Sequence, residues 1–140
     1  WYTILKRRPN YRLAFDNFDA QKIAAYDDIK RTQLLADPGI IRNKLKVQAF
    51  ISNAQKFLEV QDAFGSFDSY IWQFTDHQVI DNPLKEMADY PANTHRSDAM
   101  SKDLKQRGFK FVGSTICYAF MQACGMVNDH MADCWVRSDI

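Results

Sequence analysis

The stretch Arg107-Gly108-Phe109-Lys110-Phe111-Val112-Gly113-Ser114-Thr115 decides how this chain is interpreted. Two glycines bracket a short apolar and basic turn, and helix-like segments lie on both sides of it. Glycine lets a backbone come close to a ligand because it carries no side chain. The start of a helix presents unpaired N–H groups and a partial positive charge, which suit an anion. Residues 108–114 therefore predict a backbone site for a phosphate, in the arrangement of a helix–hairpin–helix.

A purely structural turn is the competing interpretation, because ordinary corners between helices also contain glycine. The spacing alone gives a DNA-backbone site and a structural corner about equal weight. Lys105 and Arg107 before the turn, and Lys110 at its tip, form a local basic cluster that favours nucleic acid. The cluster matters because the net charge of the chain is only +1, so DNA would have to be held by a local patch or by backbone amides.

Helical periodicity extends to nearly every segment outside this turn. Ile40, Val47, Ile51, Ala54 and Leu58 recur every three or four residues and predict the longest helix. No segment alternates cleanly as a strand would, so the fold class is predicted to be all-α, a helix–hairpin–helix bundle forming a single domain over residues 1–140. We expect these boundaries: a helix end stopped by Pro9, caps at Asp19 and at Asp27 or Asp28, a helix from Ile40 or Ile41 to Gly65, a polar loop over 75–94, a helix capped by Ser97 or Asp98, a helix from Thr115 to Cys124, and a last helix over 128–135.

The composition bounds the class of protein. A hydrophobic share of 46% supports a real core, and 25% charged residues argue against disorder. The odd count of three cysteines gives no disulfide framework, and together with the lack of a signal peptide it favours a reducing, cytoplasmic setting. No apolar run is long enough to span a bilayer, and we expect a monomer.

A few residues could carry chemistry, each with an ordinary alternative. His130 and Cys134 lie one helical turn apart in the expected last helix, and imidazole and thiolate are good zinc ligands. Zinc takes four ligands, so on spacing alone an incidental pair is favoured. Trp1 could be a stacking surface for an extruded base or a core residue. Asp129 is interpreted as a helix cap, and Cys117 and Cys124 as core positions.

Residues 107–134, RGFKFVGSTICYAFMQACGMVNDHMADC, resemble the signature of the bacterial type I 3-methyladenine DNA glycosylases. Two upstream blocks agree, WYTILKRRPNYRLAF at 1–15 and GIIRNKLKVQAFISNA at 39–54, so the resemblance covers nearly the whole chain. It implies an enzyme that flips 3-methyladenine out of alkylated double-stranded DNA and hydrolyses its N-glycosidic bond without cutting the strand. The positive charge of this base makes it a good leaving group, and an aromatic pocket would favour it by cation–π attraction.

The resemblance also implies roles for individual residues. Trp1 matches the base-stacking tryptophan, Gly108–Ser114 match the hairpin that grips phosphate, and His130 and Cys134 match two of the four ligands of a structural zinc. In the family a segment preceding the position of Trp1 supplies the other two ligands and the pocket glutamate, so no catalytic residue is assigned in this chain. We therefore expect the parent protein to be the enzyme and these 140 residues alone to show little or no activity. The alternatives are a non-catalytic helix–hairpin–helix DNA-binding fragment and a helical interaction protein that binds no DNA.

Overall fold

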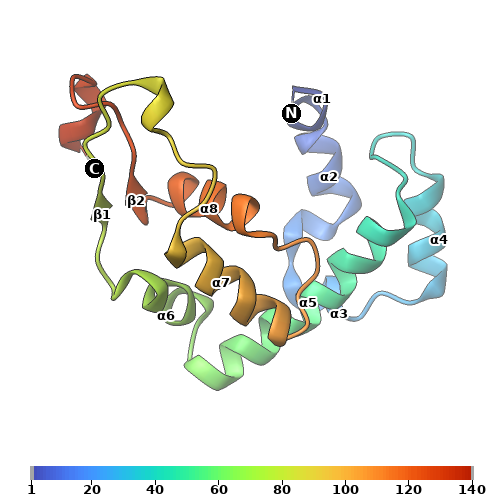
Figure 1. The fold of residues 1–140 in the computed structure, drawn as a ribbon. Coiled ribbons are helices and arrows are strands. Elements are labelled where there is room, and N and C mark those ends of the chain that lie inside the picture. The colour runs from blue at the N-terminus through green and yellow to red at the C-terminus, as the bar shows by residue number, and fades with distance from the viewer. Residues whose placement is uncertain (1, 140) are drawn as a thin grey trace. The chain divides into compact units, whose positions relative to one another are not determined.

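The structure, a computed structural model, describes residues 2–139. Trp1, the expected base-stacking residue, lies outside the described residues, so its role stays a prediction. The all-α class is confirmed, since eight α-helices account for most of the described chain (Figure 1). Their bounds are α1 Tyr2–Lys6, α2 Arg8–Ala14, α3 Ala20–Ala24, α4 Asp28–Ala36, α5 Lys44–Phe64, α6 Phe67–Trp72, α7 His95–Gln106 and α8 Ser114–Ala123. Short 3-10 helices cover Asp16–Phe18, Gln73–Thr75, Met87–Asp89 and Trp135–Asp139. None of the helices in this described range has the length and apolarity that crossing a membrane requires.

The chain divides into two compact units. Unit 1 contains residues 1–63 together with Gly108–Lys110, and unit 2 contains residues 64–107 and 111–140. The prediction of a single domain is not tested by this division and stays a prediction.

Unit 1 is built around α5, whose predicted apolar positions Val47, Ile51 and Ala54 are buried. Phe15 is fully buried in the core of this unit, and its ring stacks on Phe50 at 4.2 Å between centroids. Such an aromatic pair adds about 1 kcal/mol beyond the free energy of burying its area. The periodicity therefore predicted the inner face of α5 correctly.

Two helix boundaries in unit 1 differ from the predicted ones. Pro9 does not end a helix but lies in the first turn of α2, where a residue without an N–H loses no hydrogen bond. The long helix α5 begins at Lys44, after Ile40 and Ile41, because the Asn43 side chain accepts a hydrogen bond from the Lys46 amide at 3.0 Å. The predicted cap at Asp19 is confirmed, and of the two candidates for α4 the cap is Asp27.

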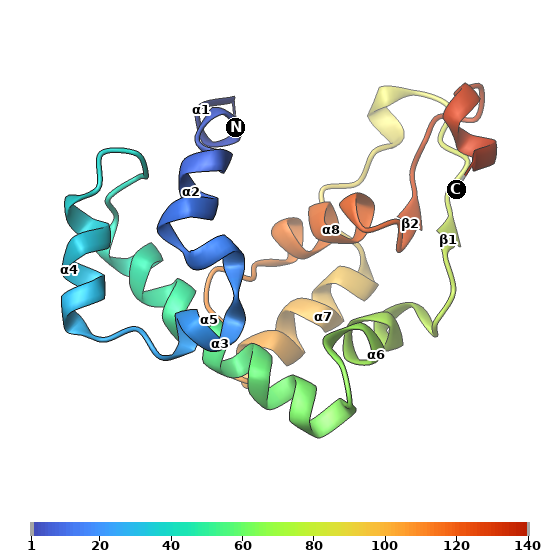
Figure 2. The same cartoon turned by 180° about the vertical axis from the view of Figure 1, so that it is seen from behind.

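Unit 2 has α7 and α8 packed against each other, as both views show (Figures 1 and 2). Met100 and Met121 are fully buried there, and Leu104 nearly so. The cap of α7 is Thr94, not Ser97 or Asp98; Ser97 instead closes a capping box with Thr94. At the other end of α8, Gly125 has a φ of +72°, a conformation that glycine adopts without strain after a helix.

The last predicted helix, over 128–135, is wrong. Val127–Asn128 form strand β2, which pairs in parallel with β1, Ile80–Asp81, inside the segment predicted to be loop. The Asn128 side chain accepts from the His130 amide at 3.3 Å and donates to the Arg137 carbonyl at 3.3 Å, bonds that compete with helical ones. Asp129 is accordingly not a cap: it is 7% exposed and its carboxylate accepts three side-chain hydrogen bonds.

Candidate nucleic-acid interface and metal ligands

The tip of the hairpin between α7 and α8 is hydrogen-bonded to one side chain of α5, that of Asn53. The Lys110 amide donates to Asn53 Oδ1 at 2.8 Å, and Asn53 Nδ2 donates back to the Lys110 carbonyl at 3.0 Å. Sequence reasoning did not find Asn53. The available signal was an amide side chain between the buried residues Ile51 and Ala54 of an amphipathic helix, where a polar group needs a specific partner.

Two left-handed residues give the hairpin its shape. Gly108 has a φ of +94°, and a Cβ there would lie 3.2 Å from Cε of Lys56. Phe111 also has a positive φ, 59°, although it is a bulky residue. A non-glycine residue held this way costs about 1–3 kcal/mol, and such strain is found preferentially at ligand-binding sites. The hairpin is thus held in one conformation by its surroundings.

Gly113 is a glycine for which neither backbone nor packing gives a reason. Its φ is −65° and its ψ is 156°, which any residue adopts, and a Cβ would meet nothing within 4 Å. Among the described residues no side chain caps α8, because Gly113 occupies the N-cap position and the Ser114 hydroxyl pairs with the Ser97 hydroxyl at 2.9 Å. The first amides of α8 thus have no intrahelical acceptor and no capping side chain. An anion could approach them without meeting a side chain at position 113.

The residues predicted to contact the DNA backbone differ in whether their polar groups and side chains are already used within the protein. Phe109 is 8% exposed, so its side chain is buried. The Val112 carbonyl accepts from the Ser101 hydroxyl at 2.6 Å, which fixes the return to α8 within unit 2. The Lys110 amide is used by Asn53. Phosphate binding by Gly113 and Ser114, at the start of α8, stays a prediction.

One member of the predicted basic cluster, Arg107, is paired with a carboxylate. Arg107 Nε donates to the Asp103 carboxylate at 2.7 Å, and its guanidinium lies 4.8 Å from the Phe64 ring and 5.0 Å from the Tyr70 ring. The Asp103 carboxylate raises the pKa of Arg107 and also accepts the Tyr70 hydroxyl at 2.7 Å. Arg107 is therefore a structural cation of unit 2, while Lys105 and Lys110 stay exposed.

The charges are distributed unevenly between the two units. Unit 1 contains twelve lysines and arginines against seven acidic residues, whereas unit 2 contains six against ten. The net charge of the whole chain is thus near zero, although unit 1 has a clear excess of basic residues. Because phosphate attracts local positive charge, we expect the electrostatic share of DNA binding to come from the unit that holds the hairpin tip.

Replacing Asn53 by alanine is expected to lower DNA affinity about tenfold, because a loosened hairpin must be reordered on binding at a cost of about 1.4 kcal/mol. Two hydrogen bonds are lost, and the free energy of unfolding should fall by about 1–2 kcal/mol. Fluorescence anisotropy with a labelled duplex and urea denaturation measure the two effects. Gln55→Ala is the matched control, since Gln55 also donates to a backbone carbonyl from α5, that of Ala24, away from the hairpin. Equal losses for the two variants would contradict a role of Asn53 in DNA binding.

His130 and Cys134 meet, although no helix carries them. A turn in which the Cys134 amide donates to the Met131 carbonyl at 2.9 Å brings Cys134 Sγ to 3.5 Å from His130 Nδ1. Nitrogen and sulfur bound to one tetrahedral zinc, at about 2.0 and 2.3 Å, would be separated by about 3.5 Å. The pair fits the donor set of zinc, but the described residues contain no cluster of three or more candidate ligands. Cys124, expected in the core, is exposed, whereas Cys117 is buried as predicted.

The comparisons with known proteins identify the family of the chain. The sequence model of the methyladenine glycosylase family matches residues 1–138. DNA-3-methyladenine glycosylase 1 of Escherichia coli K12 is 47% identical over 96% of this chain and 72% of its own length. The Haemophilus influenzae DNA-3-methyladenine glycosylase is 41% identical over the same shares. A solved 3-methyladenine DNA glycosylase I from Staphylococcus aureus, 31% identical, superposes with a TM-score of 0.93 over 98% of this chain and 73% of its own. Another, also 31% identical, is a complex with 3-methyladenine that superposes with the same TM-score over 98% of this chain and 74% of its own.

The helices and the strained hairpin between α7 and α8 define a helix–hairpin–helix protein. Together with these comparisons, they show that the chain belongs to the methyladenine glycosylase family.

Proposed function

We propose that this protein is a monofunctional DNA glycosylase that excises 3-methyladenine from alkylated duplex DNA in base excision repair. Two relatives, 47% and 41% identical to this chain, are named DNA-3-methyladenine glycosylases, and a structural relative was solved with 3-methyladenine bound. The protein would act as a monomer in the cytoplasm. Within the structure, the observation that carries the proposal is the start of α8, where Gly113 leaves the first amides without a capping side chain.

The hairpin would hold the DNA while the damaged base leaves the helix. Amides at the start of α8 donate to phosphate oxygens, and the helix dipole adds to the attraction. Asn53 keeps the hairpin in the binding conformation beforehand, so little entropy is lost on contact. Flipping a nucleotide costs a few kcal/mol of stacking and pairing, and the fixed backbone contacts offset that cost. The cationic 3-methyladenine is a good leaving group, so the N-glycosidic bond breaks without an enzyme nucleophile.

The test of this function measures which bonds are broken. The natural protein should release free 3-methyladenine from alkylated DNA, detected by chromatography, and leave the DNA strand intact. Because Lys110 is assigned no nucleophilic role, borohydride should trap no covalent protein–DNA adduct. A trapped adduct or strand scission would contradict the monofunctional mechanism. Steeply salt-dependent DNA binding without preference for alkylated DNA and without base release would instead support a non-catalytic binding module.

We also propose that His130 and Cys134 supply two ligands of a structural zinc ion. The support is the 3.5 Å separation of Nδ1 and Sγ and the chemistry of imidazole and thiolate. Bound zinc would supply cross-linking and no chemical step. It would tie the segment after β2 to the ligands that complete its coordination.

His130→Ala is expected to lower zinc content to below half of the wild-type value and to lower Tm by several degrees, since structural zinc contributes directly to folding free energy. Atomic absorption spectrometry and thermal denaturation, with and without a chelator, measure both effects. His77 serves as the control, because it is an exposed histidine in unit 2. Zinc content that is unchanged in His130→Ala and equal to that of His77→Ala would remove His130 from the ligand set.

A further inference from the structure

His130 and Cys134 lie close together although no helix carries them. The two residues lie in a segment that follows β2 and precedes a 3-10 helix at Trp135–Asp139. Main-chain bonds join it to the segment around β1: the Asn82 amide donates to the Asn128 carbonyl at 3.0 Å, and the Ala132 amide to the Leu84 carbonyl at 2.8 Å. Within the turn, the Cys134 amide donates to the Met131 carbonyl at 2.9 Å and the His130 amide to Asn128 Oδ1 at 3.3 Å.

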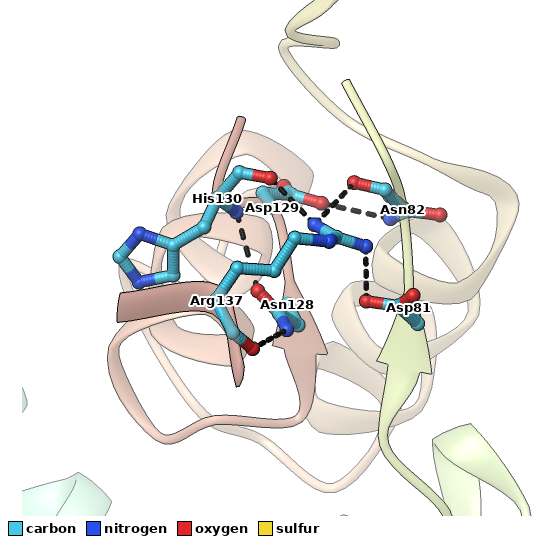
Figure 3. Close-up of polar contacts among 6 residues, drawn as sticks. All are labelled: Asp81, Asn82, Asn128, Asp129, His130 and Arg137. Carbon is cyan, nitrogen blue, oxygen red and sulfur yellow. Dashed lines mark hydrogen bonds and ion pairs between the residues drawn. The ribbon is translucent and has the colours of Figure 1, made fainter. Parts of the chain in front are cut away.

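Arg137 makes a further contact with this turn. Its Nη1 donates to the His130 carbonyl at 2.5 Å and to the Asn82 carbonyl at 3.2 Å, and its Nη2 bonds the Asp81 carboxylate (Figure 3). The side chain is only 15% exposed. The guanidinium of Arg137 therefore connects three segments. These are the end of β1, His130, and the 3-10 helix Trp135–Asp139 that carries Arg137 itself.

We propose that Arg137 is the residue that positions His130 and Cys134 for metal binding, an inference that rests on the zinc pair proposed above. Arg137 acts through the backbone, since Figure 3 shows the imidazole of His130 pointing away from the guanidinium. The Arg137 amide donates to the Cys134 carbonyl at 3.0 Å. Arg137 thus bonds the main chain of both ligand residues, one through its side chain and one through its amide.

The role is geometric rather than electrostatic. A positive guanidinium close to a divalent cation would weaken metal binding by itself, and the Asp81 carboxylate offsets this charge. The gain comes from ligands that are already 3.5 Å apart before the metal arrives, so that less conformational entropy is lost on binding. Lysine cannot replace the interaction, because a single ammonium does not reproduce the planar fork that reaches two carbonyls and a carboxylate.

The experiment compares Arg137→Lys with Arg96→Lys in the intact protein, using Co²⁺ as the spectroscopic probe and chelator competition for Zn²⁺ affinity. Arg96 is the matched control, because its Nη1 also bonds one carbonyl, Phe74 at 2.9 Å, and one carboxylate, Asp76 at 3.0 Å. We expect Arg137→Lys to weaken Zn²⁺ binding about 10–100-fold and to alter the Co²⁺ d–d bands, as loss of an outer-shell partner does. Arg96→Lys should leave both unchanged.

Unchanged Zn²⁺ affinity and Co²⁺ bands in Arg137→Lys would overturn the inference, and so would equal losses in both arginine variants. If His130→Ala loses the metal while Arg137→Lys keeps it, only this inference fails; if His130→Ala keeps the metal, the zinc pair fails with it. Circular dichroism checks folding. Should Arg137→Lys not fold, Asp81→Ala frees one arm of the fork and is expected to weaken Zn²⁺ binding in the same direction, with wild-type affinity as the contradicting result.

Discussion

Gly113→Val is expected to lower affinity for duplex DNA about 100-fold while the protein stays folded. A valine side chain at this position would occupy the space through which phosphate reaches the first amides of α8. Losing two charge-assisted hydrogen bonds costs about 3 kcal/mol, which corresponds to that loss of affinity. The backbone of Gly113, with a φ of −65°, accepts valine, and no atom lies within 4 Å of a Cβ placed at this position. The free energy of unfolding should therefore change by less than about 1 kcal/mol.

Gly125→Ala is the control for this prediction, because Gly125 lies at the opposite end of α8 in equally open surroundings. Its φ of +72° makes alanine strained, so stability should fall by about 1 kcal/mol while DNA affinity is unchanged. Anisotropy titrations and urea denaturation of both variants give the two quantities. If Gly113→Val binds DNA as tightly as the wild type, phosphate does not contact the start of α8 and the proposed interface is wrong.

The sequence placed the hairpin correctly because its signals are local. Two glycines, a basic tip and a following helix lie within nine residues, and each has a meaning independent of the rest of the chain. What the sequence could not separate was the role of each glycine. Gly108 is favoured by its positive φ, whereas the φ of Gly113 and the space around it would accept other residues. That distinction depends on backbone conformation, which composition does not contain.

The His130–Cys134 pair was predicted for the wrong physical reason. A spacing of four residues brings two side chains together on a helix, and here a turn after β2 produces the same proximity. The pairing of Ile80 with Val127 joins residues far apart in the chain, and it was not predicted because local periodicity does not report long-range register. The ion pair of Arg107 with Asp103 had a local signal that was not used, since Asp103 lies four residues before it on α7.

The same long-range packing places the Asp129 carboxylate in a buried hydrogen-bond network of unit 2. Its carboxylate accepts from Asn82 and Gln122 at 2.7 Å each and from the Tyr118 hydroxyl. Tyr118 is 2% exposed, and burial together with the Asp129 carboxylate raises its pKa above the usual range. The Tyr118 hydroxyl is therefore a permanent donor that depends on this one acceptor.

Asp129→Leu is expected to lower the free energy of unfolding by about 3 kcal/mol or more, because it leaves the buried Tyr118 donor unsatisfied and removes two further bonds. Tyr118→Phe alone should cost only about 1 kcal/mol, since Asp129 keeps the Asn82 and Gln122 amides. In the double variant no buried hydroxyl is left without an acceptor, so its loss should be smaller than the sum of the single losses by about 1–2 kcal/mol. Urea denaturation of the four proteins completes this cycle. Strictly additive losses would show that Asp129 and Tyr118 do not depend on each other, and the destabilisation would then have to arise from the change of shape alone.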